Sequence, residues 1–274
     1  MNQTKDQITR NIRDGYKKMG IPVLSYSSLT LYDGCPYCYY LKYICGVKQK
    51  WISPNLIFGT LIHKILENEK VLKSPSMLNE LIDDTIEYEL RYKYLLKSST
   101  AQIKNDVIKM TELIKNNPLM RGDKPIILKE REREIIKSIG LGYPLNSFAV
   151  HAKIDGLTDR NEIVEHKTSS IKYTEKKIRE SHQHVIYAIM AGCDTVIYDI
   201  LYKAKDPIRE QITINVSKQD KEKTIEWMNK LATNIIKEIW TPYKNINYQH
   251  LMWCDHKNMC PYCSKKQRVK VTQR

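Results

Sequence analysis

Residues 148–168 alternate between apolar and polar side chains in two short runs, and this stretch constrains the fold more than any other part of the chain. The first run leads up to Asp155, a polar turn follows at residues 158–161, and the second run covers residues 162–168. A period of two is typical of β-strands. The stretch therefore predicts two neighbouring strands joined by a tight turn.

The second run places charged residues on a largely apolar strand. Glu165 and Lys167 share one face with Ile163, and His166 lies on the opposite face. Burying a charge costs several kcal/mol unless the charge is paired or binds a metal. Two interpretations follow: a surface ion pair on an edge strand, or a metal site. In the second, Asp155 and Glu165 hold a divalent cation and Lys167 lies beside an attacked phosphate.

The overall charge points to a polyanionic partner. The chain has 274 residues with 45 Lys+Arg against 31 Asp+Glu, a formal net charge of +14. Such a surplus favours nucleic acid first and an anionic membrane surface second. No apolar run of about 18 residues predicts a transmembrane helix, and the polar N-terminus lacks a secretory signal. We therefore expect an intracellular, cytoplasmic protein without a membrane partner. The sequence also lacks a Walker-type phosphate loop, which excludes an in-chain motor of that class.

The remaining periodic segments predict an α/β fold. Ser25 is a candidate N-cap, and amphipathic periodicity predicts helices at 25–32, 58–70, 172–191 and 218–240, with one or two more over 76–116. β-Branched and alternating residues predict strands at 126–139, 195–203 and 211–216.

Two further features bear on the candidate site. His63 lies off the apolar stripe of its helix, so its side chain is either solvated or directed into a cleft. In the strand at 126–139, alternation places Glu130, Glu132 and Glu134 on one face. A solvated edge strand accounts for most of these carboxylates, and one of them could reach the metal.

Seven cysteines in an intracellular chain predict metal ligands or free thiols before disulfides. Cys35–Cys38 and Cys260–Cys263 are both CPYC pairs. Two such pairs are typical of a four-cysteine zinc site.

Five motifs follow one another along the chain: Ser25-Tyr26-Ser27-Ser28-Leu29 with Tyr32 and Cys35-Pro36, Gly59-x-x-x-His63, Asp155, Glu165-x-Lys167-Thr168, and Gln183-x-x-x-Tyr187. In this order they resemble the RecB-like branch of the PD-(D/E)xK nuclease superfamily, which includes the iron–sulfur nucleases of CRISPR adaptation and small phage exonucleases. The resemblance covers about residues 22–264 and implies a bacterium or a phage-infected host. The family usually has glycine where this chain has Ala152.

The resemblance implies a restriction-endonuclease-like fold: a central mixed sheet flanked by helices, with a helical insertion. It implies Mg2+ or Mn2+ held by His63, Asp155, Glu165 and the backbone carbonyl of His166. Lys167 would orient or deprotonate the attacking water, or stabilise the transition-state charge. Two further residues would position the phosphate or the DNA strand: Gln183 and Tyr187.

The resemblance also implies a [4Fe–4S] cluster that tethers the two ends of the chain. Its expected ligands are Cys35, Cys254, Cys260 and Cys263, with Cys38 as a reserve. The C-terminal spacing C-x5-C-x2-C differs from the order usual in the family, which leaves Zn2+ as the alternative. Two cysteines outside these motifs are expected to be ordinary buried thiols: Cys45 and Cys193.

The expected function is that of a metal-dependent DNA exonuclease in recombination, repair or phage DNA processing. Its partners would be single-stranded DNA or duplex ends and a separate helicase or recombinase. The alternative is a non-catalytic DNA-binding or zinc/iron–sulfur scaffold on the same fold. The expected organisation is a polar arm at 1–20 and one nuclease domain at 21–264, with a helical lobe at about 60–120 and a catalytic core at about 125–216. A DNA-binding basic tail at 265–274 includes Lys265, Lys266, Arg268 and Lys270.

Overall fold

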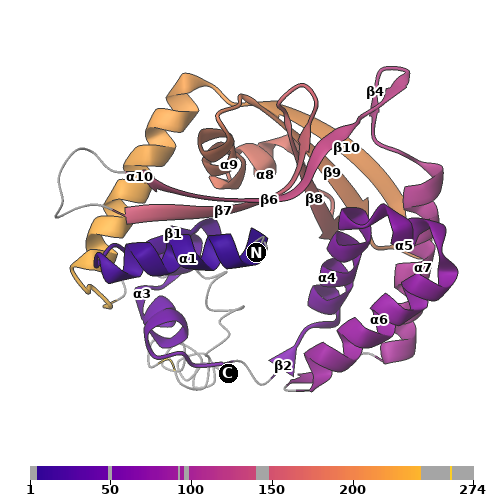
Figure 1. Ribbon diagram of the computed structural model, residues 1–274, viewed down its shortest axis with the longest axis horizontal. Helices are drawn as coiled ribbons and strands as arrows, with labels where there is room; N and C mark the ends of the chain where they lie inside the picture. Colours follow the sequence, from indigo (N-terminus) through magenta and orange to yellow (C-terminus); the bar gives the residue numbers. More distant parts are fainter. Residues whose placement is uncertain are drawn as a thin grey trace, which may run out of the picture. The chain divides into compact units, whose positions relative to one another are not determined.

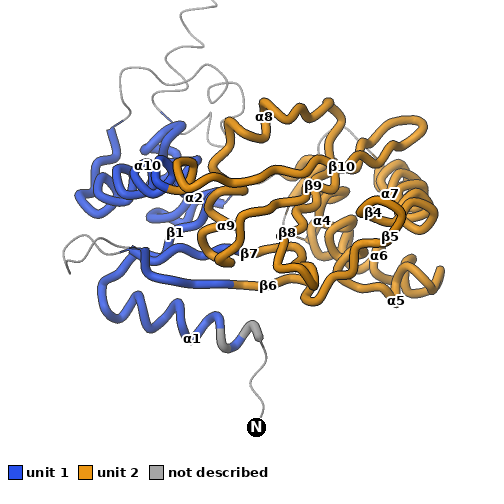
Figure 2. The backbone as a smooth tube through the Cα atoms, turned by 90° about the horizontal axis from the view of Figure 1, so that it is seen from above, with its two compact units in different colours: residues 1–49, 135–152, 222–274 blue, residues 50–134, 153–221 orange. Residues whose placement is uncertain are grey.

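The computed structural model describes residues 5–48, 51–91, 93–95, 99–139, 148–241 and 260. Within these residues it is a mixed α/β fold whose main sheet has six strands, which confirms the predicted fold class. The chain divides into two compact units, coloured separately in Figure 2. Unit 1 comprises residues 1–49, 135–152 and 222–274, and unit 2 comprises residues 50–134 and 153–221. The predicted single domain at 21–264 stays a prediction.

Unit 1 contains the N-terminal helices, a short strand, parts of two longer strands and most of the last helix of the described residues, and Figure 1 shows these elements. Its elements are α1 (Lys5–Lys18), β1 (Val23–Ser25), α2 (Tyr26–Gly34), α3 (Pro36–Tyr39), the π-helix η1 (Tyr40–Ile44) and α10 (Lys218–Ile236), which begins in unit 2. Strand β1 pairs in parallel with the first residues of β7 (Phe148–Thr158).

Ser25 is the N-cap of α2, as the sequence predicts, and it takes part in a capping box. The Ser25 side chain accepts from the backbone N–H of Ser28, and the Ser28 hydroxyl accepts from that of Ser25. This start directs Tyr32 into the core of unit 1, where its hydroxyl donates to the Ile239 carbonyl at 2.6 Å. Helix α2 is thereby fixed to the segment that follows α10.

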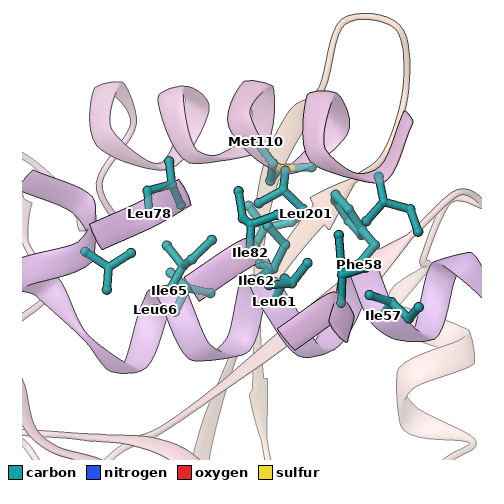
Figure 3. Packing of buried hydrophobic residues seen from close by; sticks show 14 of the residues in the cluster. Ile57, Phe58, Leu61, Ile62, Ile65, Leu66, Leu78, Ile82, Met110 and Leu201 are labelled. Atoms are coloured by element: carbon teal, nitrogen blue, oxygen red, sulfur yellow. The ribbon is translucent and has the colours of Figure 1, made fainter. Parts of the chain in front are cut away.

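The helical part of unit 2 packs on a continuous apolar core (Figure 3). Its helices are α4 (Pro54–Glu67), α5 (Glu69–Lys73), α6 (Pro75–Leu90) and α7 (Thr100–Asn116). Figure 3 shows the apolar stripe of α4 facing side chains of α6, α7 and β9 (Thr195–Tyr202). The stripe consists of Ile57, Phe58, Leu61, Ile62, Ile65 and Leu66. Burial of this stripe fixes the rotation of α4 about its axis and therefore the direction of His63.

Helix α4 begins earlier and ends earlier than predicted. Ser53 caps its first turn and Pro54 occupies the first helical position, where a missing N–H costs nothing. Asn68 ends α4 and its side chain caps α5. The segment 76–116, predicted to hold one or two helices, holds two, α6 and α7. Two short strands near these helices, β2 (Trp51–Ile52) and β3 (Tyr94–Leu95), pair in parallel.

The sheet strands carry the predicted hairpin. Strand β7 pairs antiparallel with β8 (Ile163–Ser169), β8 pairs in parallel with β9, and β9 pairs antiparallel with β10 (Ile208–Asn215). The strand order is β1-β7-β8-β9-β10, with β6 (Leu128–Ile139) also on β7. A separate small hairpin joins β4 (Met120–Arg121) and β5 (Lys124–Pro125). Asn161 closes the β7–β8 turn in the left-handed conformation, with φ 59°.

Two local predictions are wrong. The helix predicted at 172–191 is two helices, α8 (Glu175–Arg179) and α9 (Gln183–Ala191), because the Ser181 hydroxyl accepts from the Gln183 N–H and starts a new helix. The regular alternation predicted for β6 is also interrupted. Glu132 has φ 52°, and Glu130 forms an ion pair with Arg133. No helix among the described residues is long and apolar enough to cross a membrane.

Candidate active site and metal centre

Asp155 and His63 form the first part of the candidate site, and both belong to unit 2. Asp155 is buried near the end of β7. Its Oδ1 lies 3.2 Å from Nδ1 of His63 on α4, and its Oδ2 accepts the backbone N–H of His166 at 2.8 Å. Of the two interpretations of His63, the structure shows the one directed inward, toward a carboxylate.

Glu165, Lys167 and Gln183 form the second part. The Lys167 Nζ donates to Glu165 Oε1 at 2.6 Å and to Gln183 Oε1 at 2.9 Å. Gln183 Nε2 donates to Glu165 Oε1 at 2.9 Å and to the Tyr187 hydroxyl at 3.2 Å. The period of β8 brings Glu165 and Lys167 to one face, and the first turns of α9 bring the glutamine and tyrosine to them.

One oxygen of this network has no partner. Glu165 Oε2 is buried and makes no hydrogen bond within the described residues, whereas Oε1 accepts two. A buried unsatisfied carboxylate oxygen is costly. Burial raises the pKa of Glu165 to about 7; the Lys167 ammonium opposes this and the Asp155 charge adds to it. A cation beside this oxygen would satisfy it and would favour the ionised form of the carboxylate.

The other charged groups of the site are stabilised in their ionised forms. Burial alone would raise the pKa of Asp155, but the His63 hydrogen bond and charge outweigh it and lower that pKa. Burial would lower the pKa of His63, but Asp155 raises it overall. Burial likewise opposes protonation of Lys167, and the Glu165 carboxylate outweighs it, so the pKa of the lysine is raised. Lys167 is therefore an ammonium ion at neutral pH.

A buried ion network behind β8 escaped sequence reasoning. His166 Nδ1 lies 2.7 Å from Asp199 Oδ2, and Arg209 donates to both Asp199 oxygens at 2.7 and 2.8 Å. Asp199 is fully buried, and although burial raises its pKa, the hydrogen bonds from His166 and Arg209 lower it overall. One feature of the sequence indicates this network: a single aspartate within the otherwise largely apolar strand TVIYDILY.

The glutamates of β6 make other contacts. Glu132 forms an ion pair with Lys153, and Glu67 on α4 lies close enough to Glu132 to share a hydrogen bond. Burial, followed by the Glu132 charge, raises the pKa of Glu67. Glu67 also interacts electrostatically with His63, so this second acidic group lies near one of the candidate metal ligands. A metal contact by one of the β6 glutamates stays a prediction.

The residues of the candidate site fit a divalent cation. Asp155 and Glu165 supply hard carboxylate oxygens, which Mg2+ and Mn2+ prefer. The Glu165 Oε2 atom has no hydrogen-bond partner among the described residues, so it can serve as a metal ligand. The ligand assignments, including the carbonyl of His166, stay predictions.

A second candidate metal centre lies in unit 1. Cys35, Cys38 and Cys260 are buried, and their Sγ atoms lie within 4.8 Å of one another. Cys38, expected only as a reserve, is thus part of the group. The other two expected ligands, Cys254 and Cys263, lie outside the described residues.

Two thiols lie outside this group. Cys193 is buried, as expected, and burial raises its pKa. Cys45 was expected to be buried and is exposed, because it follows the last turn of η1. The tail residues predicted to bind DNA lie outside the described part of the chain: Lys265, Lys266, Arg268 and Lys270.

Comparisons with solved structures agree with the fold. A structure named "Putative exonuclease" from Eubacterium rectale is similar over 97% of this chain and 93% of its own, with a TM-score of 0.57 and 12% identity. A phage-related exonuclease from Haemophilus somnus 129PT matches 70% of this chain and 97% of its own, with a TM-score of 0.29 and 12% identity. At 12% identity the likeness to the Eubacterium rectale structure concerns the fold alone.

Sequence comparison supplies the family. No curated protein matches significantly. The family model of the PD-(D/E)XK nuclease superfamily, however, matches residues 23–268, nearly the whole chain and all of the candidate site. The chain belongs to the PD-(D/E)XK nuclease superfamily.

Proposed function

We propose that this nuclease hydrolyses DNA phosphodiester bonds with a divalent metal and acts as an exonuclease. The observation that carries the proposal is the pair of buried carboxylates, Asp155 and Glu165, with Lys167 bonded to Glu165 and one Glu165 oxygen unpartnered. The membership of the superfamily gives the reaction class.

The roles follow from chemistry and charge. Asp155, Glu165 and the His166 carbonyl would hold Mg2+ or Mn2+, with His63 beside them, and the cation would supply Lewis-acid stabilisation of the phosphate oxygens. Lys167 has a raised pKa, which favours an electrostatic role toward the phosphate over that of a proton acceptor. Gln183 contacts both charged partners, so it would hold their geometry while a phosphate binds.

The nature of the substrate is supported by charge. A net charge of +14 favours a polyanion, and the similar Eubacterium rectale structure carries an exonuclease name. We propose DNA ends or single strands as substrate, in recombination, repair or phage DNA processing, with a helicase or recombinase as partner. A non-catalytic scaffold is less well supported, since it has no need of a buried charged group that costs stability.

We further propose that Cys35, Cys38 and Cys260 hold a structural metal. Sulfurs bound to one zinc ion lie about 3.8 Å apart, since each Zn–S bond is about 2.3 Å. The three thiols, all within 4.8 Å of one another, are compatible with a shared ion of this kind. Because both cysteines of the first CPYC pair belong to the group, the arrangement favours zinc over a cluster with one N-terminal ligand.

The substrate proposal is tested with labelled linear and circular DNA, single- and double-stranded, and with RNA of the same sequence. Each is incubated with Mg2+, Mn2+ or EDTA. We expect metal-dependent release of short products from linear DNA and little cleavage of circles. Cleavage of circular DNA at the same rate would show an endonuclease, and cleavage of RNA alone would contradict the substrate assignment.

A further inference from the structure

A pocket of about 260 Å3 lies in unit 2 beside the end of β8. Its walls come from the first turns of α4, from the end of β8 with the loop that follows, and from the residue after β9. The lining residues that matter here are Asn55, Phe58, Thr168, Ser169, Ser170 and Lys203. The pocket shares no lining residue with the predicted metal and catalytic group, so nothing in the proposed reaction yet uses it.

Lys203 gives the pocket a fixed cation. Its Nζ lies 2.9 Å from Asp106 Oδ2 and 5.0 Å from the centre of the Phe58 ring. Phe58 is itself buried in the apolar core around α4 (Figure 3), so the packing of that core holds its ring in place. The ammonium is therefore held at the wall of the pocket in an ion pair with one carboxylate.

Uncommitted hydrogen-bonding groups complete the lining. Ser169 is used locally, since its hydroxyl donates to the Ile171 carbonyl and accepts from the Ile171 N–H. The side chains of Asn55, Thr168 and Ser170, by contrast, make no hydrogen bond within the described residues. Lysine, serine, threonine and asparagine side chains are the groups that proteins use to contact DNA phosphates.

The position of the pocket relates it to the candidate active site. Thr168 directly follows Lys167 on β8, and a strand advances ~3.3 Å per residue. On α4, Phe58 precedes His63 by five positions, or ~8 Å of helix. Thr168 lies on the face of β8 opposite to Lys167, and the two are neighbours at the carboxyl end of the strand, where the elements that carry Lys167 and His63 also line the pocket.

We propose that this pocket binds a phosphate of the DNA strand next to the phosphodiester that lies at Glu165 and Lys167. The inference rests on the proposed function, because it says where the DNA strand bound at the candidate active site continues. The volume of about 260 Å3 suits a phosphate with part of its nucleoside and is below the ~300–1,000 Å3 of pockets for larger ligands. The bound phosphate would be internal to the strand or terminal, and the two sources are separable by experiment.

The test measures binding in EDTA, so that cleavage plays no part. Short single-stranded oligonucleotides carry one uncharged methylphosphonate at each position in turn, and a second set differs only in a terminal phosphate. The variants are Lys203→Gln and Asp106→Asn/Lys203→Gln, the second of which leaves no carboxylate without its partner. Lys205→Gln, an exposed lysine two residues away, removes the same charge as a control.

We expect wild type and Lys205→Gln to lose affinity about tenfold or more when one particular phosphate is neutralised or removed, as for a charged hydrogen bond. Both Lys203 variants should lose that sensitivity at that position and keep it elsewhere. A terminal phosphate as the sensitive group identifies a strand-end site, and an internal one identifies a strand-continuation site.

An unchanged position profile in both Lys203 variants would overturn the inference. If Lys203→Gln does not fold, the double variant and Ser170→Ala provide the same comparison. A profile that changes as expected in a protein that never cleaves DNA with Mg2+ would refute the proposed hydrolysis and leave the phosphate site standing.

Discussion

His166 Nδ1 and Asp199 Oδ2 lie 2.7 Å apart in the interior of unit 2, directly behind the strand face that carries Glu165 and Lys167. The contact ties β8 to β9 at the position where the His166 backbone N–H also donates to Asp155. Because His166 is a proposed metal ligand and also a partner of the buried Asp199, stability and metal affinity should change together.

We therefore predict that Asp199→Asn weakens both. Removing one partner of a buried ion pair costs about 3–5 kcal/mol, and here it leaves Arg209 without its carboxylate. Denaturant unfolding should show a loss of that order, and Mg2+ affinity should fall about tenfold as Asp155 loses its support. Asp194→Asn, which removes an exposed carboxylate just before the start of β9, is the control. An Asp199→Asn protein with wild-type stability and metal affinity would contradict this account.

The sequence predicted the active-site hairpin because a strand period of two directly determines which side chains share a face. It did not predict the Asp199–Arg209 contact. That contact depends on the β9–β10 register, which pairs Gln211 with Asp199 and places Arg209 diagonally across. No local pattern encodes a register of this kind.

Other departures have local causes. The helix break before Gln183 comes from one serine hydroxyl, Ser181, that satisfies a backbone N–H, and serine has only a moderate helix propensity, so its presence alone does not mark a break. The grouping of Cys38 with Cys35 depends on α3, because a one-turn helix brings residues three positions apart to the same side. Cysteine spacing alone left both ligand sets open.

Metal binding should release a proton near neutral pH. The pKa of Glu165 is raised to about 7, so below that pH a cation must displace a proton from the carboxyl group. Apparent metal affinity should rise up to about tenfold per pH unit below pH 7 and level off above it. Calorimetry in buffers of different ionisation enthalpy counts the released proton. Metal affinity independent of pH across this range would argue against Glu165 as a ligand.

The thiol group of unit 1 should depend equally on each of its cysteines. Cys35→Ser, Cys38→Ser and Cys260→Ser should each lose a bound metal and lower the melting temperature, because all three sulfurs converge on one place. Cys193→Ser, at a buried thiol outside the group, should keep the metal. Elemental analysis should find one zinc per chain. A brown protein with about four irons would show that the centre is an iron–sulfur cluster.

Acid should destabilise unit 2 through His184. Burial lowers the pKa of this histidine to about 4, from an ordinary value of 6.5. The unfolded chain binds the proton first as pH falls, so stability is full above pH 6.5 and decreases toward pH 4, by about 1 kcal/mol per pH unit. His184→Phe keeps a ring against Tyr198 and removes the titration. Urea unfolding across this range should give a shallower pH dependence for the variant, and identical curves would exclude His184 as the cause.

The most direct test of the account compares Mg2+-dependent cleavage of labelled linear DNA by wild type, Glu165→Gln and Glu175→Gln. The second variant removes an exposed carboxylate on α8 and serves as the matched control. We predict that the control cleaves at the wild-type rate and that Glu165→Gln is slower by about a thousandfold, or about 4 kcal/mol in the barrier, with a melting temperature close to wild type. A folded Glu165→Gln protein that cleaves DNA as fast as wild type would contradict the central claim.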